Sequence, residues 1–130
     1  MNLLLDTHTF LWLVVGSPNL STVAQTALSD PGNALFLSVV SVWELAIKAS
    51  SPKQKLKLSD PLDIYIAKWA TTYQLILLPI QTTHALTVGQ LPHHHRDPFD
   101  CLLLAQALVE GMTLVSGDGK FAPYPITILW

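Results

Sequence analysis

Asn-Leu-Leu-Leu-Asp, at residues 2–6, is the strongest structural signal in this chain of 130 residues. A continuous apolar run of this length is typical of a strand that is buried on both faces, as in a parallel sheet. The run stops at a carboxylate, Asp6, and a helical stretch follows from His8 to Val15. We therefore expect the chain to begin with a buried strand and a helix.

The alternation of short apolar strands and helices continues along the whole chain. Further strands are predicted at 34–38, 75–78, 112–116 and 126–129, and further helices at 21–29, 39–49, 61–73, 82–90 and 97–110. Asp60-Pro61 and Asp97-Pro98 each combine a capping acid with a proline at the first helical position. With no internal repeat or linker, the sequence predicts a single α/β domain over residues 1–130, with a mostly parallel sheet of about five strands.

The composition narrows the classes of protein that remain. Half of the residues are hydrophobic, 12% are charged, and the mean hydropathy is +0.40. No apolar run approaches the ~20 residues of a membrane span, and residues 1–15 lack the basic region of a signal peptide. A single cysteine, Cys101, excludes an internal disulfide and a cysteine-rich zinc site. We expect a cytoplasmic protein with no membrane association, whose high apolar content serves a partner or self-association surface.

Four of the nine acids fall where an α/β sheet binds ligands. Asp6 ends the first strand, Asp118 follows the strand at 112–116, Asp100 lies in the first turn of helix 97–110, and Glu44 lies in an apolar helix. Ligands of open α/β sheets bind beyond the carboxyl ends of the strands. Oxygen ligands suit Mg²⁺ or Mn²⁺ better than zinc, and carboxylates held together need such a cation to offset their repulsion. Sites of this kind are typical of phosphodiester hydrolysis.

Most of these acids also have an ordinary structural explanation. Asp97 is a helix N-cap, Asp100 favours the helix dipole, Asp118 is a turn residue between two glycines, and Glu44 can pair with Lys48 four residues later. Asp6 is the hardest to explain in this way, since a strand end offers it no evident capping role. The sequence therefore leaves both interpretations open for every acid except Asp6, for which it favours a functional role.

The histidines and tryptophans give weaker signals. Three adjacent histidines at 93–95 cannot all face one ion, and they favour a solvated or substrate-facing loop. No serine or cysteine is placed to form a catalytic triad with a histidine, and no glycine-rich phosphate loop is present. The tryptophans, which are Trp12, Trp43, Trp69 and Trp130, lie among apolar neighbours and indicate core or interface positions in preference to base-stacking platforms.

Basic residues near the acids are candidates for contact with a nucleic acid. Lys48, Lys53, Lys55 and Lys57 follow Glu44, and Arg96 and Lys120 flank the later acids. The net charge is −2, and the charges of the chain without the four clustered acids sum to +2. A slightly acidic chain can therefore still bind a phosphate backbone, and Lys48, Arg96 and Lys120 are the candidate contacts with a nucleic acid. For the lysines at 53, 55 and 57 a solvated loop is the alternative.

Four segments that occur in order resemble the PIN-domain family, specifically the VapC-like ribonuclease toxins of bacterial type II toxin–antitoxin systems. They are LLLDTHTFLW at 3–12, SVVSVWELAIK at 38–48, HRDPFDCLLLAQA at 95–107 and TLVSGDGKFAPYPI at 113–126. The segments span nearly the whole chain, and each holds one of the expected acids. The chain departs from the family at Cys101, where related sequences usually have arginine, and at Gly117 and Gly119, which loosen the turn around Asp118.

The resemblance implies a three-layer α/β/α fold and a metal-dependent endoribonuclease that attacks an RNA phosphodiester with water. It implies that Asp6, Glu44, Asp100 and Asp118 form the catalytic Mg²⁺ or Mn²⁺ site, with Asp97 as a secondary ligand candidate. Thr7 and Ser116 match small hydroxyl residues that orient ligands or water beside the site.

The resemblance also implies partners, which are an RNA substrate, a second copy of the chain in a homodimer, and a cognate antitoxin that silences the toxin. The alternative is a PIN-fold module that binds RNA or protein with weak or no cleavage. A phosphatase of another α/β fold is a third hypothesis, and the absence of a second acid in Asp6-Thr7-His8-Thr9 counts against it.

Overall fold

The computed structural model describes residues 1–53, 56–93 and 97–130. Its elements in chain order are β1 (Asn2–Leu5), α1 (Thr7–Val15), α2 (Thr22–Ser29), β2 (Ala34–Ser38), α3 (Val39–Ser50), α4 (Leu62–Thr72), β3 (Ile76–Leu78), α5 (Thr82–Val88), α6 (Pro98–Glu110), β4 (Thr113–Val115), a 3₁₀ turn η1 (Gly119–Phe121) and β5 (Ile128–Leu129). Among the residues considered above, Lys55, His94, His95 and Arg96 lie outside the described residues. No helix within the described ranges is long and apolar enough to cross a membrane.

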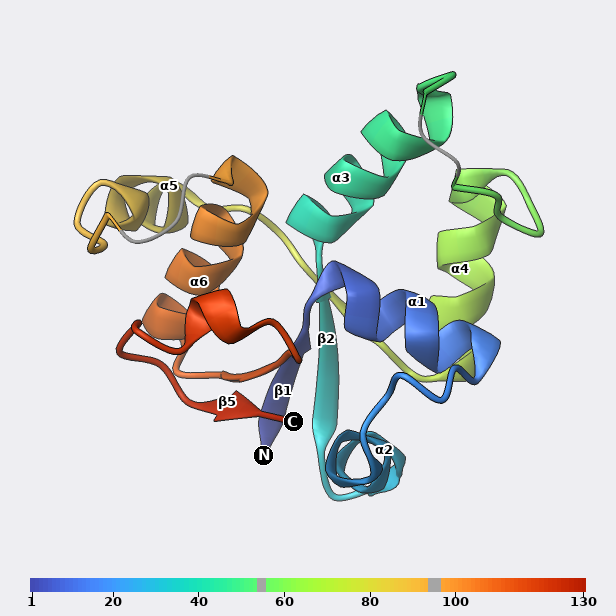
Figure 1. Ribbon diagram of the computed structural model, residues 1–130, viewed down its shortest axis with the longest axis horizontal. Coiled ribbons are helices and arrows are strands. Elements are labelled where there is room, and N and C mark those ends of the chain that lie inside the picture. Colours follow the sequence, from blue (N-terminus) through green and yellow to red (C-terminus); the bar gives the residue numbers. More distant parts are fainter. Residues whose placement is uncertain (54–55, 94–96) are drawn as a thin grey trace.

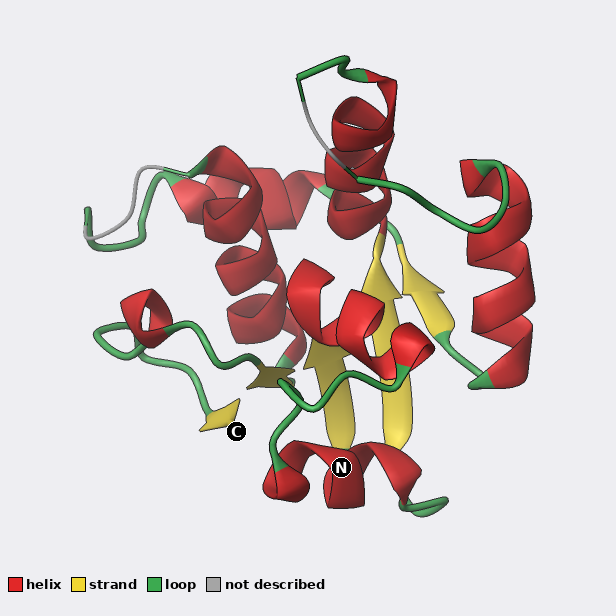
Figure 2. Ribbon diagram, turned by 45° about the vertical axis from the view of Figure 1, so that its right-hand side comes forward, coloured by secondary structure: helices red, strands yellow, loops and turns green. Residues whose placement is uncertain are grey.

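The five strands form one parallel sheet in the order β3-β2-β1-β4-β5. The strand predicted from the leucine run, β1, lies at the centre, where Leu4 is in register with Phe36 of β2 on one side and with Leu114 of β4 on the other. Figure 2 shows the arrows of β1, β2 and β3 side by side and pointing in the same direction. The prediction of a parallel sheet of about five strands is confirmed.

Alternate leucines of β1 face two separate hydrophobic clusters. Leu3 and Leu5 belong to the cluster that packs against α1, α2, α3 and α4, through residues such as Phe10 and Leu45. Leu4 belongs to the cluster on the opposite face, which α6 fills. Figure 1 shows α5 and α6 on one side of the sheet and α1, α3 and α4 on the other. The fold is thus the predicted three-layer α/β/α arrangement, in which every β1 side chain after Asn2 is buried.

The strand order places a topological switch at β1. From β1 the chain proceeds outward to β2 and β3, and then returns to add β4 on the other side of β1. The loops that leave β1 and β4 therefore turn to opposite faces of the sheet and leave a crevice between them, which is where open α/β sheets bind their ligands. Asp6 follows β1 directly, and Ser116 follows β4. The topology thus brings two of the sequence segments singled out above to one edge.

The helix starts explain why several polar residues stand where they do. Ser21 and Asp97 cap α2 and α6 as predicted. The predicted cap at Asp60 is wrong: Pro61 occupies the N-cap position in an extended conformation, so α4 begins at Leu62. The Asp60 carboxylate instead lies 3.7 Å from the Lys68 ammonium.

A buried polar network ties α6 to the start of α3. The Gln106 side chain is fully buried, and its amide oxygen accepts a hydrogen bond from the Ser38 hydroxyl, which in turn accepts the backbone N–H of Val40 as the cap of α3. The Gln106 amide nitrogen donates to the Pro79 carbonyl at 3.2 Å. Because α3 carries Glu44 and α6 carries Asp100, this network fixes the relative position of two helices that bear candidate site residues.

We expect Gln106→Leu to destabilise the protein by about 1–3 kcal/mol, because it removes the side-chain partner of the buried Ser38 hydroxyl and the donor to the Pro79 carbonyl. Urea denaturation measures the change as a shift in the midpoint with an unchanged slope. Gln25→Leu on the exposed side of α2 is the matched control and should cost less than about 0.5 kcal/mol. Equal effects of the two substitutions would contradict a stabilising role for the network.

Candidate active site

Asp6 lies at the junction of β1 and α1 and has both carboxylate oxygens engaged. The residue is 8% exposed, and its side chain caps α1, since Oδ1 accepts the backbone N–H of Thr9 at 2.7 Å. Oδ2 accepts the Ser116 hydroxyl at 2.5 Å. The expectation that Asp6 has no capping role is therefore wrong, because α1 begins at Thr7 immediately after the strand. The cap fixes the carboxylate at the carboxyl end of the central strand.

Ser116 links the loops that leave β1 and β4. Its hydroxyl donates to Asp6 and accepts the backbone N–H of Asp118 at 3.1 Å, and its side chain is buried. The Asp118 carboxylate accepts the backbone N–H of Lys120 at 2.9 Å and caps the 3₁₀ turn. The serine thus contacts the carboxylate of one acid and the backbone of the other.

Thr7 performs the same task toward α3. Its buried hydroxyl lies 2.9 Å from Oε1 of Glu44 and 3.0 Å from the hydroxyl of Ser41. The other Glu44 oxygen, Oε2, accepts the Lys48 ammonium at 2.6 Å, so the i, i+4 pair considered in the sequence analysis is formed. The contact with Thr7 nevertheless holds Glu44 close to the carboxyl end of β1, because Thr7 directly follows Asp6 there.

Asp97 and Asp100 occupy the start of α6. One Asp97 oxygen, Oδ1, accepts the backbone N–H groups of Phe99 at 2.9 Å and of Asp100 at 3.4 Å. The predicted N-cap is therefore present, and it sets Asp100 in the first turn of the helix with its side chain partly buried. Burial and the charges of Asp100 and Asp97 also raise the pKa of the neighbouring Cys101 thiol, so this side chain remains neutral.

Electrostatics shows that these acids share one region. The pKa of Asp100 is raised from 3.8 to about 7, first by burial and then by the negative charges of Asp97, Glu44, Asp118 and Asp6, in that order. These neighbours come from α6, from α3 and from the segments after β4 and β1. Like charges raise the pKa of a carboxyl group because they disfavour its ionised form. All five acids that the sequence singled out therefore lie close enough for the charges of the other four to act on Asp100.

The acids form a cluster of oxygen donors with excess negative charge, which is the environment a hard divalent cation favours. Over residues 1–53, 56–93 and 97–130, however, no three side chains of His, Cys, Asp or Glu are grouped closely enough to form a ready-made metal site. A cation bound here would therefore draw the carboxylates closer together. The residues fit such an ion by their chemistry and their shared electrostatic field.

The basic residues that are candidates for contact with a nucleic acid differ in their surroundings. Lys48 is 31% exposed at its side chain and pairs with Glu44, whereas Lys120 is exposed in the turn that Asp118 caps. The third candidate, Arg96, lies outside the described residues. Lys120 is thus the described cation that combines exposure with proximity in sequence to a clustered acid.

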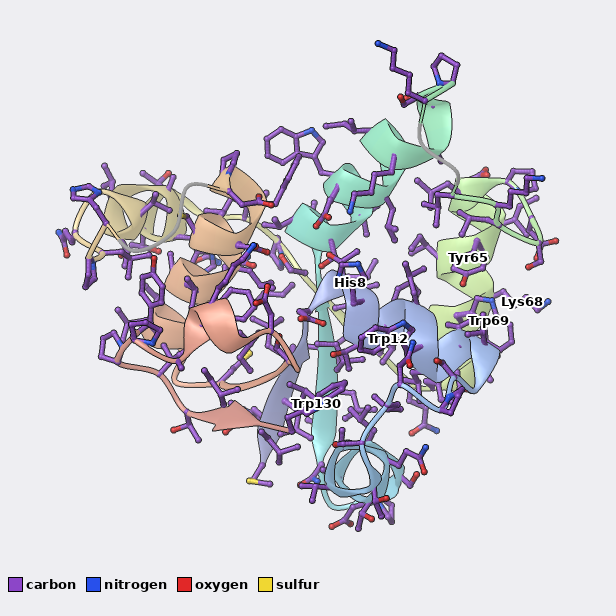
Figure 3. The ribbon with its side chains drawn as sticks, in the orientation of Figure 1. His8, Trp12, Tyr65, Lys68, Trp69 and Trp130 are labelled. Atoms are coloured by element: carbon purple, nitrogen blue, oxygen red, sulfur yellow. The ribbon has the colours of Figure 1, made fainter. Side chains whose placement is uncertain are left out.

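A pocket of about 210 Å³ adjoins two of the acids. Its lining consists of Asp6, His8, Trp12, Gly117 and Asp118. His8 and Trp12 come from α1, and their rings lie 5.7 Å apart between centroids. Figure 3 shows both side chains on α1, above Trp130 in that view. The acid cluster therefore has an aromatic pocket beside it.

Sequence reasoning missed Ser41 and the two ring residues of this pocket. Ser41 lies three residues before Glu44, so both project from one side of α3, and this helical spacing was an available signal. His8 and Trp12 are likewise four residues apart on α1. The sequence does not tell which side of α1 faces the edge of the sheet, and for that reason the tryptophan was interpreted as a core or interface residue.

This combination of a parallel α/β/α sheet with acids at its topological switch defines a class of ligand-binding α/β domain. Within that class the family is shown directly, since the model of the PIN domain matches residues 3–126. The chain belongs to the PIN domain family. No curated protein matches the chain.

Solved structures of similar fold include VapBC and FitAcB proteins. A chain of VapBC2 from Rickettsia felis, bound to a DNA fragment from its promoter, is 20% identical with a TM-score of 0.70, over 98% of this chain and 97% of that one. DNA-bound VapBC from Salmonella typhimurium gives 17% identity and a TM-score of 0.68, over 98% and 96% of the two chains. FitAcB from Neisseria gonorrhoeae gives 20% and 0.59, over 97% and 95%. At these identities the likeness shows a shared fold.

Proposed function

We propose that the chain is a single PIN domain over residues 1–130 that acts as a metal-dependent endoribonuclease. The observation that carries the proposal is the convergence of Asp97, Glu44, Asp118 and Asp6 on Asp100, because four separate segments place negative charge around one partly buried carboxyl group. Such crowding is costly for a stable fold unless a cation offsets it. The family resemblance supplies RNA as the substrate class.

In this proposal Asp6, Glu44, Asp100 and Asp118 hold Mg²⁺ or Mn²⁺, with Asp97 as a secondary ligand that also caps α6. A divalent cation bound there would activate a water molecule and offset the charge that develops on the phosphate. Thr7 orients Glu44, and Ser116 orients Asp6 together with the loop of Asp118. These hydroxyls fix the donor atoms before the substrate binds, which reduces the reorganisation that the reaction requires.

Incubation of the purified protein with structured RNAs, in Mg²⁺, in Mn²⁺ and with EDTA, tests this function. We expect cleavage with either metal and none with EDTA. Absence of cleavage in both metals, with RNA still bound, would favour the alternative of a PIN-fold binding module. Cleavage that persists with EDTA would exclude the metal-dependent mechanism.

Lys120 is proposed to contact the RNA backbone beside the cluster, together with Lys48 and Arg96. We expect Lys120→Met to weaken RNA binding several-fold in low salt and to lower the slope of log affinity against log salt by about 0.7–1, since one phosphate contact is lost. Fluorescence anisotropy at several salt concentrations measures both quantities. Lys68→Met on α4, where the lysine pairs with Asp60, is the control that should leave the slope unchanged. Equal slopes for the two variants would contradict a contact at Lys120.

We further propose that the protein is the toxin of a toxin–antitoxin pair, located in the cytoplasm where its RNA substrate is found, and that it forms a homodimer. The neighbours described above were solved as VapBC and FitAcB complexes, which supports a cognate antitoxin as partner.

An apolar stripe lies on α3, where residues four positions apart are each more than a third exposed, namely Val39, Trp43 and Ile47. An apolar stripe of this kind is available to a protein partner. Co-purification with the product of an adjacent short open reading frame tests the pairing.

A further inference from the structure

The pocket lined by Asp6, His8, Trp12, Gly117 and Asp118 has two properties that the acid cluster alone does not explain. It has aromatic walls, and it shares two carboxylates with the cluster. Any group bound there would lie beside the site at which the RNA backbone is cleaved. The pocket is therefore placed to contact a part of the substrate other than the reacting phosphate.

The two aromatic residues of the pocket belong to a row of three rings that continues to Trp130 outside the lining. The ring centroids of His8 and Trp12 lie 5.7 Å apart, and those of Trp12 and Trp130 also lie 5.7 Å apart, with interplanar angles of 36° and 53°. In Figure 3 the row runs from the start of α1 to the segment after β5. Trp12 thus contacts two other rings, which restricts the orientation of its indole.

Gly117 makes the position of Trp130 possible. A Cβ atom on residue 117 would lie 2.6 Å from Cε2 of the Trp130 indole, well inside van der Waals contact. The glycine that follows Ser116 therefore admits an indole directly behind the loop of Asp118. The space that Gly117 leaves beside this turn is filled by the Trp130 ring, which closes one side of the row.

We propose that this pocket receives a single unpaired nucleobase of the RNA substrate, which packs against the Trp12 indole beside the phosphate held at the acid cluster. Single-stranded RNA is recognised largely through bases that stack on aromatic side chains such as Trp and His. The volume of about 210 Å³ is below the size of a pocket for a drug-sized ligand and suits one ring system. The inference rests on the proposed ribonuclease function and adds to it a determinant of which nucleotide lies next to the cleaved bond.

The test combines abasic RNA with variants of the pocket and measures binding alone. In an Asp100→Asn background, which keeps the pocket lining intact, short single-stranded RNAs with one abasic nucleotide at each successive position are titrated in Mg²⁺ by anisotropy. We expect one position at which loss of the base weakens binding about 5-fold or more. That penalty should fall below twofold when Trp12→Leu is added, since leucine keeps apolar packing but removes the ring. Trp12→Phe should retain most of the penalty.

The controls separate recognition of a base from loss of structure. His8→Ala, at an exposed position, should reduce the same penalty, whereas Trp69→Phe on α4 should leave it unchanged. Equal abasic penalties in the Trp12→Leu variant and its parent at every position would overturn the pocket assignment, even if the wild-type protein cleaves RNA. Coupling between Trp12 and one base, in a protein that cleaves no RNA with any metal, would instead leave the pocket intact and refute the proposed nuclease function.

Discussion

Asp6→Asn is expected to lower the rate of RNA cleavage by about 1000-fold while leaving the fold intact. Loss of a group that only supports a metal ligand costs roughly 10–100-fold, so loss of charge on a ligand itself should cost more. The fold should survive because an asparagine oxygen can still accept the Thr9 N–H as a helix cap, and the Ser116 hydroxyl can turn to accept from the amide. Single-turnover cleavage at saturating protein measures the effect.

The matched control for this substitution is Asp63→Asn. Asp63 is an exposed acid in the first turn of α4, away from the cluster, and its replacement removes the same charge. We expect cleavage within twofold of the wild-type rate. If Asp6→Asn also cleaved RNA within tenfold of the wild type, with an unchanged melting temperature, Asp6 would have no catalytic role.

The metal-free protein should become less stable as the pH rises from about 4 to about 7, through the titration of Asp100. The pKa of this carboxyl group is 3.8 in the unfolded reference and about 7 in the fold, so the folded state binds the proton more tightly. The contribution of Asp100 to stability is therefore complete below about pH 4. It decreases as the pH rises and is lost through about pH 7, and above that this group causes no further change in stability. Since the side chain is only partly buried, solvent screening limits the effect to about 1–2 kcal/mol, or a shift of several degrees in Tm.

Asp100→Asn should remove this pH dependence, because the amide carries no charge that its acidic neighbours could repel. At pH 8 without metal we expect the variant to melt several degrees above the wild type, and at pH 4 to melt at nearly the same temperature. Mg²⁺ should stabilise the wild type by about 1.4 kcal/mol at ten times its Kd and should stabilise the variant less. Thermal melts across pH in EDTA and in Mg²⁺, with Asp63→Asn as control, measure both effects. If the melting temperatures of the variant and the wild type differed by the same amount at pH 4 and at pH 8, the titration of Asp100 would not be the cause of the pH dependence.

The sequence predicted the fold well because the apolar pattern of this chain is strong. The leucine run that stops at an acid predicted a buried first strand, which the structure places at the centre of the sheet, and the alternation after it predicted the remaining strands and helices. The helix cap predicted at Asp60 was wrong, because that prediction used only a local signal, a capping acid followed by proline. Here the backbone at Pro61 is extended, and α4 starts one residue later.

The sequence indicated which acids lie at the candidate site, but it did not indicate the hydrogen bonds that hold them there. The positions of Asp6 and Asp118 at strand ends were readable from the sequence, because parallel strands carry their carboxyl ends to one edge. The bond from Ser116 to Asp6 and the hydroxyl of Thr7 beside Glu44 depend on which strands are neighbours, and no local pattern specifies the order β3-β2-β1-β4-β5. The close approach of Trp130 to Gly117 involves two separate segments of the chain, and for the same reason it could not be predicted from the sequence.

The central claim, that acids at the switch point of this sheet hydrolyse RNA with water, is tested most directly by the chemistry of the product ends. Purified protein is incubated with a defined RNA in Mg²⁺, and the termini of the fragments are identified by mass spectrometry. The account predicts 5′-phosphate and 3′-hydroxyl ends, with no fragments in EDTA. Fragments that carry a 2′,3′-cyclic phosphate would contradict it, because the attacking oxygen would then be the RNA 2′-hydroxyl and not a water molecule.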